Sequence, residues 1–242
     1  MYGKSAQFYD QLYAFKDYKA AAAQLHTRIN RTAPHAKSLL DVACGTGRHL
    51  EFLREHYRVE GVDINPDLLA RARARCLDVP FHCLDMTAFD LQRSFDVVSC
   101  LFSAIAYVRT PESLRKTVVC LARHLAPGGV LFLEPYFTPE QYWVDKVTLN
   151  TVVEPSCKIA WMYVSRREGN LGIQDVHYLV GTPEGIQSFS ERHELGLFTE
   201  SEYQNAFADA GLTTTFDETG LFGRGMYVAQ AAASSAGPAA TR

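Results

Sequence analysis

The chain has 242 residues, 47% of them hydrophobic, and carries 24 Lys and Arg against 27 Asp and Glu. This length and hydrophobic content suit one sizeable α/β domain with a large core. The nearly balanced charge, without a basic run, argues against a nucleic-acid partner. The N-terminus has no apolar signal core and no apolar run approaches membrane-spanning length, which predicts a cytoplasmic protein without a membrane partner.

The six cysteines show no regular spacing. They lack the paired spacing that zinc sites use, and several fall inside apolar runs. We therefore predict that they are reduced core residues and that the protein has no metal site.

The first predicted element is a helix over residues 5–32, where apolar residues recur at helical spacing. From residue 38 onward, strand-like and helix-like segments alternate. The predicted strands are 38–43, 58–63, 79–85, 95–100 and 130–135, and the predicted helices between them are 47–56, 66–75 and 111–125, with a turn over 126–129. Strands that alternate with helices predict a doubly wound, mostly parallel sheet with right-handed crossovers.

The pattern changes in the second half of the chain. Residues 148–197 contain three strand-like runs, separated by Gly169-Asn170 and by the stretch 181–185, both typical of hairpins. We predict an antiparallel β insertion of about three strands.

The α/β pattern then resumes with a helix that Thr199 and Glu202 begin as a capping box and that Gly211 ends. Two further strands around a glycine-rich turn complete a seven-stranded sheet. Residues 1–231 are thus predicted to form one domain, and residues 232–242, which show no periodicity, a disordered tail.

The stretch "LLDVACGTGRHL", residues 39–50, places a nearly bare loop at the carboxyl end of the first strand of the sheet. Ligands bind at this edge of open α/β sheets, and Gly45 and Gly47 let a ligand approach the backbone closely. Asp63 ends the second strand, where its carboxylate can accept hydrogen bonds from both hydroxyls of a ribose. Asp85 and Met86 follow the third strand, where they can border an adenine ring.

The loop does not fit the dinucleotide fingerprint G-x-G-x-x-G. Counted from Gly45, the third glycine would be Leu50; counted from Ala43, it would be Arg48. The order fits the D-x-G-x-G-x-G loop of class I S-adenosylmethionine-dependent methyltransferases, with Ala43 in the first glycine position.

A closer resemblance lies in the segments "FYDQLY", "LLDVACGTGRHLEF", "LFSAIAYV", "HLAPGGVLFLEP", "VHY", "FSERHELGLF" and "GRGMYV". From about Tyr2 to Val228 the chain resembles the N-methyltransferases that dimethylate the 3-amino group of nucleotide-linked deoxysugars. The resemblance implies S-adenosyl-L-methionine as cofactor, a sugar-nucleotide acceptor such as a TDP-linked deoxyaminosugar, a role in antibiotic biosynthesis and a homodimer.

The resemblance also implies the residues of the site. The cofactor-binding residues would be Tyr13, Tyr18, Ala43, Cys44, Gly45, Thr46, Gly47, His49, Asp63, Ile64, Asp85, Met86, Leu101, Phe102 and Ser103. Tyr107, Tyr136, Phe137 and Arg224 would bind the acceptor, with the Arg224 guanidinium on its diphosphate. Tyr13, His177 and His193 would be catalytic, because histidine titrates in the range in which an amine loses its proton.

Two other functions stay open at this point. The chain could methylate nitrogen or oxygen on a different small metabolite, or it could be a non-catalytic protein that binds S-adenosylmethionine. No strong general base is required, because alignment of a neutral amine with the methyl group can carry most of the rate acceleration.

Overall fold

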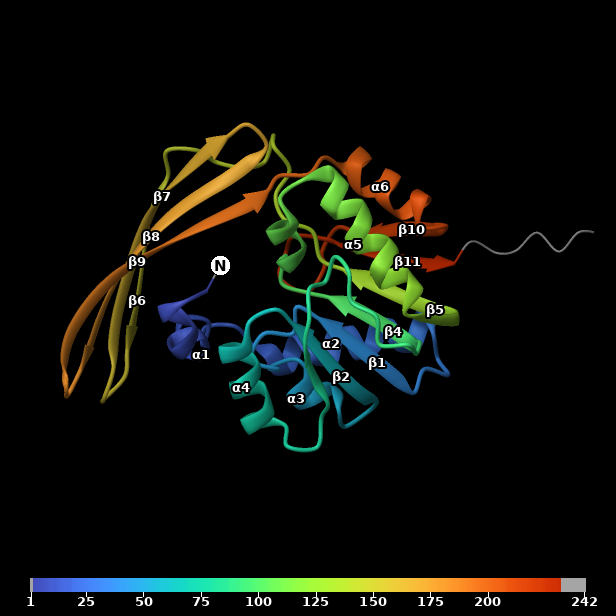
Figure 1. Cartoon of the computed structure of the whole chain (residues 1–242), viewed down its shortest axis with the longest axis horizontal. Coiled ribbons are helices and arrows are strands. Elements are labelled where there is room, and N and C mark those ends of the chain that lie inside the picture. The colour runs from blue at the N-terminus through green and yellow to red at the C-terminus, as the bar shows by residue number, and fades with distance from the viewer. Residues whose placement is uncertain (1, 232–242) are drawn as a thin grey trace, which may run out of the picture.

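The computed structural model describes residues 2–231, which form two β-sheets with helices around the larger one (Figure 1). The larger sheet has seven strands in the order β10-β11-β5-β4-β1-β2-β3. It is parallel from β3 to β5, whereas β11 runs antiparallel to both of its neighbours. The strands are β1 (Ser38–Val42), β2 (Arg58–Asp63), β3 (Phe81–Cys83), β4 (Phe95–Cys100), β5 (Leu125–Leu133), β10 (Leu212–Asp217) and β11 (Met226–Ala231). This architecture confirms the predicted sheet; the predicted tail, 232–242, lies outside the described residues.

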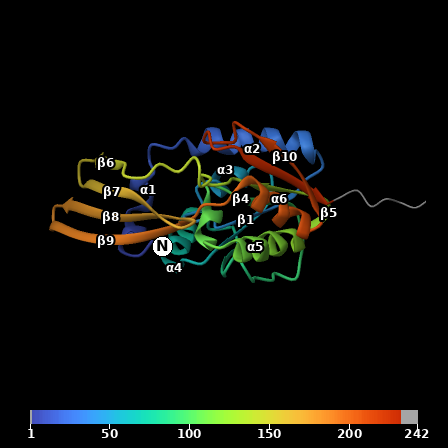
Figure 2. The same ribbon diagram turned by 90° about the horizontal axis from the view of Figure 1, so that it is seen from above.

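Helices cover both faces of the seven-stranded sheet. The helices of the described residues are η1 (Lys4–Phe8), α1 (Tyr9–Leu12), α2 (Tyr18–Thr32), α3 (Leu50–Leu53), α4 (Pro66–Arg75), η2 (Ala104–Val108), α5 (Pro111–Arg123) and α6 (Glu200–Asp209). Successive strand residues point to opposite faces, so Leu39 joins the core with α2, α3 and α4 while Leu40 joins the core with α5 and α6. Figure 2 shows α2 and α5 on opposite sides of the sheet. No helix within residues 2–231 is long and apolar enough to span a membrane.

The long helix predicted for residues 5–32 is wrong, because the structure breaks it between Leu12 and Tyr18. Asp17 begins α2 as its N-cap, and its Oδ1 atom accepts a hydrogen bond from the Ala20 N–H at 2.9 Å. The cap favours a new helix start over continuation of the first one. As a result, Tyr13 and Lys16 between the two helices are partly buried.

Some of the other predicted helix and turn boundaries agree with the structure, and others do not. Asn65 caps α4 and Pro66 occupies its first turn, and α6 carries the predicted capping box of Thr199 and Glu202. By contrast, the helix predicted over 47–56 is reduced to the four residues of α3. The predicted turn over 126–129 lies within β5, where Gly128 has a φ of 76° and the pairing with β4 shifts register.

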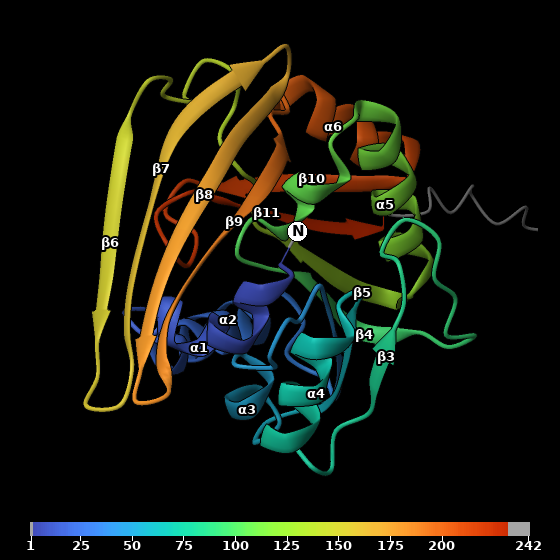
Figure 3. The same ribbon diagram turned by 60° about the vertical axis from the view of Figure 1, so that its left-hand side comes forward.

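The β insertion has four strands rather than three. They are β6 (Val147–Val153), β7 (Lys158–Glu168), β8 (Leu171–Thr182) and β9 (Gly185–Gly196), and each pairs antiparallel with the next. The first predicted run contains two strands because residues 154–157 form a turn, closed by a hydrogen bond from the Glu154 N–H to the Cys157 carbonyl at 2.9 Å. Figures 1 and 3 show this sheet standing apart from the seven-stranded one, with η1 and α1 between them.

The N-terminal segment attaches the insertion sheet to the rest of the molecule. Phe8 and Leu12 form a core with Val176, Tyr178 and Val180, which share one face of β8. Strand alternation therefore turns this face of the sheet inward and the other face outward.

Candidate active site

A cavity of about 1240 Å³ lies between the two sheets. The ends of β1 and β2 line it through Gly45 and Asp63, and the inner face of the insertion sheet lines it through Val176 and His193. The segment between α1 and α2 lines it through Tyr13, Phe15, Lys16 and Asp17. The cavity therefore collects residues from the N-terminal segment, the parallel sheet and the insertion.

The glycine loop forms the floor of the cavity together with Asp63. The Gly45 N–H donates to Asp63 Oδ2 and the Asn65 N–H donates to Asp63 Oδ1, both at 2.8 Å. Burial raises the pKa of Asp63, and these two backbone N–H groups oppose that rise. Ala43 has a φ of 58°, a left-handed conformation that favours glycine, so the alanine at this position carries backbone strain.

Nine of the predicted cofactor-binding residues line this cavity. They are Tyr13, Ala43, Gly45, Asp63, Ile64, Asp85, Met86, Phe102 and Ser103. They come from the ends of β1, β2, β3 and β4 and from the N-terminal segment. The parallel register of these strands explains the convergence, because it places their carboxyl ends at one edge of the sheet.

Five further predicted residues line a small recess of about 20 Å³ that shares Tyr9, Ala43 and Phe102 with the cavity. They are Tyr18, Cys44, Thr46, His49 and Leu101. Within the described part of the chain, Tyr18 Oη and His49 Nε2 are buried without a hydrogen-bond partner. Buried polar atoms of this kind fit the polar methionine end of S-adenosylmethionine. Burial also lowers the pKa of His49 to about 3, so its ring is neutral at neutral pH.

Gly47 was predicted to touch the cofactor, but it lines neither space. A Cβ at this position would lie 3.2 Å from the Ala72 Cβ and 3.4 Å from the Phe81 ring. Gly47 has a φ of 72°, a left-handed conformation that favours glycine. A glycine is therefore needed here for the turn and for close packing against α4 and β3.

The four predicted acceptor residues, Tyr107, Tyr136, Phe137 and Arg224, all line the cavity. The Arg224 guanidinium carbon lies 5.5 Å from the ring centroid of Tyr136 and 5.0 Å from that of Phe137. Its Nη1 donates to Ser103 Oγ at 3.0 Å, which places the guanidinium beside the predicted cofactor residues.

His193 points into the cavity from β9. It is only 4% exposed, and its Nδ1 lies 2.9 Å from Tyr107 Oη. Burial lowers the pKa of His193 to about 4. The ring is therefore neutral at neutral pH, and it forms a hydrogen bond with Tyr107 rather than an ion pair.

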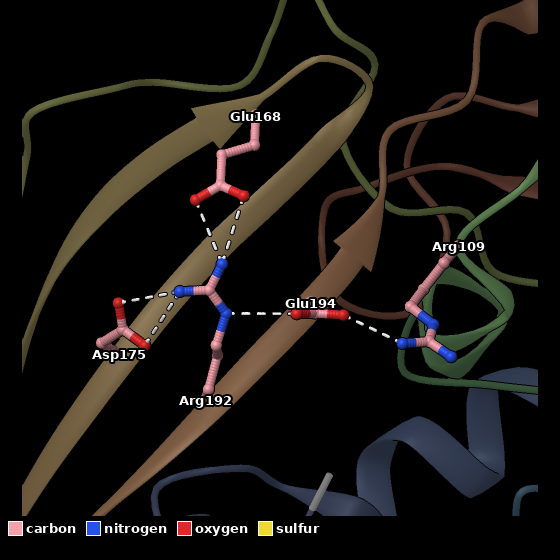
Figure 4. A network of polar contacts seen from close by, with 5 residues as sticks. All are labelled: Arg109, Glu168, Asp175, Arg192 and Glu194. Carbon is pink, nitrogen blue, oxygen red and sulfur yellow. Dashed lines mark hydrogen bonds and ion pairs between the residues drawn. The ribbon is translucent and has the colours of Figure 1, made fainter.

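His177 was predicted to be catalytic as well, and the structure corrects this prediction. It is exposed on the outer face of β8, between the inward-facing Val176 and Tyr178, and does not line the cavity. The same outer face carries a polar network in which Arg192 bonds Glu168, Asp175 and Glu194 (Figure 4).

This network extends beyond the insertion sheet, because Glu194 also pairs with Arg109 at 2.9 Å, directly after η2 (Figure 4). It thereby ties the strand that carries His193 to the short helix that carries Tyr107. Exposed ion pairs are individually weak, so its effect is to orient the two elements rather than to stabilise the fold strongly.

Several residues that line the cavity were not predicted from the sequence, among them Tyr2, Tyr9, Lys16, Trp143 and Lys146. The expectation of one continuous helix hid Lys16, because a helix would have placed it on the solvent side. The cluster of tyrosines before residue 14 was a usable signal, since its rings pack against one another: the ring centroids of Tyr2 and Tyr9 lie 5.0 Å apart in an edge-to-face contact, and those of Tyr9 and Tyr13 lie 4.8 Å apart in a tilted one.

Lys16 lies between two aromatic rings. Its Nζ is 3.1 Å from the ring centroid of Phe102 and 3.7 Å from that of Phe222. Burial lowers the pKa of Lys16 to about 7, and the charge of Glu134 opposes this shift. Glu134 is fully buried and accepts a hydrogen bond from the Phe102 N–H.

We expect the Lys16→Met variant to be more stable than wild type at pH 6, with a difference that shrinks as the pH rises from 7 toward 10. Between the folded pKa of about 7 and the ordinary value of 10.5, the unfolded chain binds more protons, so wild-type stability rises with pH. Urea unfolding across this range measures the difference. Lys19→Met, at an exposed position of α2, controls for the loss of a lysine, and a difference independent of pH would contradict the prediction.

Comparisons with known proteins agree with this geometry. A family model described as a methyltransferase domain matches residues 39–129, from β1 into β5. The dTDP-3-amino-3,4,6-trideoxy-alpha-D-glucopyranose N,N-dimethyltransferase of Streptomyces venezuelae is 40% identical over 92% of this chain and 96% of its own.

Two solved structures resemble the whole molecule. The crystal structure of Streptomyces venezuelae DesVI has a TM-score of 0.90 and 38% identity, covering 96% of this chain and 100% of that one. The structure of S-adenosylmethionine-bound CalS10, an amino pentose methyltransferase from Micromonospora echinaspora, has a TM-score of 0.84 and 39% identity, covering 95% and 97%. Sequence identities of 38%, 39% and 40% extend over almost the full length of this chain and of each relative. They show that the chain belongs to the S-adenosylmethionine-dependent sugar N-methyltransferases.

Proposed function

We propose that this enzyme transfers methyl groups from S-adenosylmethionine to the 3-amino group of a TDP-linked deoxyaminosugar, as a step in antibiotic biosynthesis. The observation that carries the proposal is the position of Arg224, whose guanidinium lines the same cavity as the glycine loop and bonds Ser103 beside it. A guanidinium in this place suits a phosphorylated acceptor next to the cofactor. Two relatives are named for dTDP-linked 3-aminosugars and a third for a dTDP-linked 4-aminosugar, which supports a dTDP-linked aminosugar as the acceptor.

The cofactor would be held along the ends of the parallel strands. Asp63 would accept hydrogen bonds from the ribose hydroxyls, and Ile64, Asp85 and Met86 would border the adenine. Tyr18 and His49 would meet the methionine end, where their polar atoms are buried without partners. When bound, S-adenosylmethionine supplies an electrophilic methyl group on a sulfonium cation.

Aromatic rings of the chain would stabilise the positive charge beside the reacting atoms. The rings of Tyr13 and Phe102 line the cavity in edge-to-face contact, with centroids 5.2 Å apart. Aromatic faces attract cations, most strongly where water is excluded. This contribution of the two rings requires no change of protonation state.

The amine must arrive without its proton, and neither His193 nor Tyr107, the hydrogen-bonded pair on the insertion side of the cavity, is a strong base. His193 is neutral with its pKa lowered to about 4, and burial raises the pKa of the Tyr107 hydroxyl to which it is hydrogen-bonded. We infer that His193, Tyr107 and Tyr13 orient the amine by hydrogen bonds. Alignment of the nucleophile then supplies most of the acceleration.

The function is tested by incubating the purified chain with methyl-labelled S-adenosylmethionine and a panel of acceptors. We expect label in dTDP-linked 3-aminosugars, and mass spectrometry to find one or two added methyl groups. Panel members with a 4-amino group, and small metabolites with amines or hydroxyls, define the alternatives. Preferential transfer to such a metabolite would replace the proposed acceptor, and cofactor binding without transfer to any member would identify a non-catalytic protein.

Arg224→Ala should raise the KM for the sugar nucleotide by about tenfold or more, because a hydrogen bond to a charged group contributes about 1.5–3 kcal/mol. The dissociation constant for S-adenosylmethionine should stay close to that of wild type. Arg166→Ala removes an exposed arginine on the insertion sheet and serves as the matched control. Unchanged kinetics in the Arg224 variant would rule out its contact with the acceptor phosphates.

We further propose that the enzyme acts in the cytoplasm as a homodimer. All six cysteines are unpaired, which suits a reducing compartment. The outer face of the insertion sheet exposes apolar side chains that a second copy could cover: Val147, Leu149, Val153, Met162, Leu179 and Ile186. Light scattering of the purified chain measures the mass, and a monomer at micromolar concentration would refute the dimer.

A further inference from the structure

A row of two aromatic rings flanked by two cations forms the wall of the cavity beside Arg224. The ring of Phe137 lies 5.0 Å from the Arg224 guanidinium and 5.6 Å from the Trp143 ring. The Lys146 ammonium lies 4.6 Å from the Trp143 centroid. All four side chains line the cavity, and the row runs outward from half-buried Phe137 to exposed Lys146.

The outer half of this row is held in place from behind. The Trp143 ring stacks on Tyr142, with centroids 5.5 Å apart and an angle of 17°, and Tyr142 is only 6% exposed. The backbone at Lys146 is fixed by two hydrogen bonds, from the Asp145 N–H to the Ser165 carbonyl at 2.7 Å and from the Ser165 N–H to the Lys146 carbonyl at 3.0 Å. Trp143 therefore presents a supported ring to the cavity.

The distribution of cations singles out the same place. Among residues 2–231, four lysines and arginines line the cavity: Lys16, Arg109, Lys146 and Arg224. Lys16 contacts the rings beside the glycine loop, and Arg109 pairs with Glu194 on the outer face. Only Arg224 and Lys146 then remain on the acceptor side, at the two ends of the aromatic pair.

We propose that Trp143 and Lys146 form a nucleotide subsite, in which the Trp143 ring stacks on the acceptor's base and the Lys146 charge attracts the anionic nucleotide, while Arg224 at the other end of the row contacts the diphosphate. A nucleoside diphosphate combines one flat aromatic face with negative charge, and this wall offers aromatic rings between two cations. Stacking needs a rigid ring, and Tyr142 provides the support. The inference rests on the proposed sugar-nucleotide acceptor and assigns the part of the cavity that takes its nucleotide end.

Calorimetric titration with dTDP tests the subsite without any turnover. Trp143→Ala should weaken dTDP binding about tenfold, the size of a typical base-stacking contribution, and Trp143→Phe should restore most of the affinity. Lys146→Met should weaken it about threefold at low salt and less at high salt, whereas Lys158→Met, an exposed lysine of the insertion sheet, should not. Wild-type affinity in both Trp143→Ala and Lys146→Met would overturn the proposal, and the Phe and Met variants keep it testable if Trp143→Ala fails to fold.

Kinetics separate this inference from the proposed function. With a dTDP-linked 3-aminosugar, Trp143→Ala should raise the KM about tenfold and leave kcat unchanged. With the same aminosugar as its 1-phosphate, the variant and wild type should have equal KM values, because that acceptor has no base to stack. An equal loss with both acceptors would refute stacking. If wild type methylates neither acceptor, the proposed function fails, while the dTDP titration still decides the subsite.

Discussion

Buried carboxylates at the ends of parallel strands hold the loops on which the active site depends. Asp63 accepts the N–H groups of Gly45 and Asn65, and Glu134 accepts that of Phe102. Burial raises the pKa of both acids, so each would be costly in the interior without these hydrogen bonds. The loops and the carboxylates therefore stabilise one another, and a displaced loop would leave a buried acid without its donor.

The insertion sheet and the N-terminal segment add walls to this sheet edge and so form the cavity. The parallel sheet supplies the wall that carries most of the predicted cofactor residues, and the insertion adds His193 and the inward residues of β8. Phe8 and Leu12 join the two parts through a shared apolar core. Such an enclosure suits methyl transfer to an amine, because exclusion of water and alignment of the reactants matter more here than a strong base.

Local signals were enough to predict the parallel sheet, because its apolar strands alternate with capped helices. They failed where a tertiary contact decides the conformation. The helix over 5–32 breaks at Asp17, and the region between its halves faces the cavity. The two histidines of the insertion looked equivalent in sequence, yet His193 faces the cavity and His177 faces outward, since the strand register fixes which face each residue occupies.

The sequence by itself determined that most of the predicted cofactor residues converge at one edge of the sheet. Gly45, Asp63 and Asp85 follow consecutive strands, and a parallel sheet always gathers such strand ends at one edge. Only the tertiary structure decided how the acceptor half is assembled. Resemblance to a known family pointed to Phe137 and Arg224, but not to Trp143. Phe137 and Trp143 come from one segment and Arg224 from another, and their contacts arise when the chain after β5 and the turn before β11 pack against the same cavity. A pattern of local spacing carries no information about contacts that are made only after the two sheets come together.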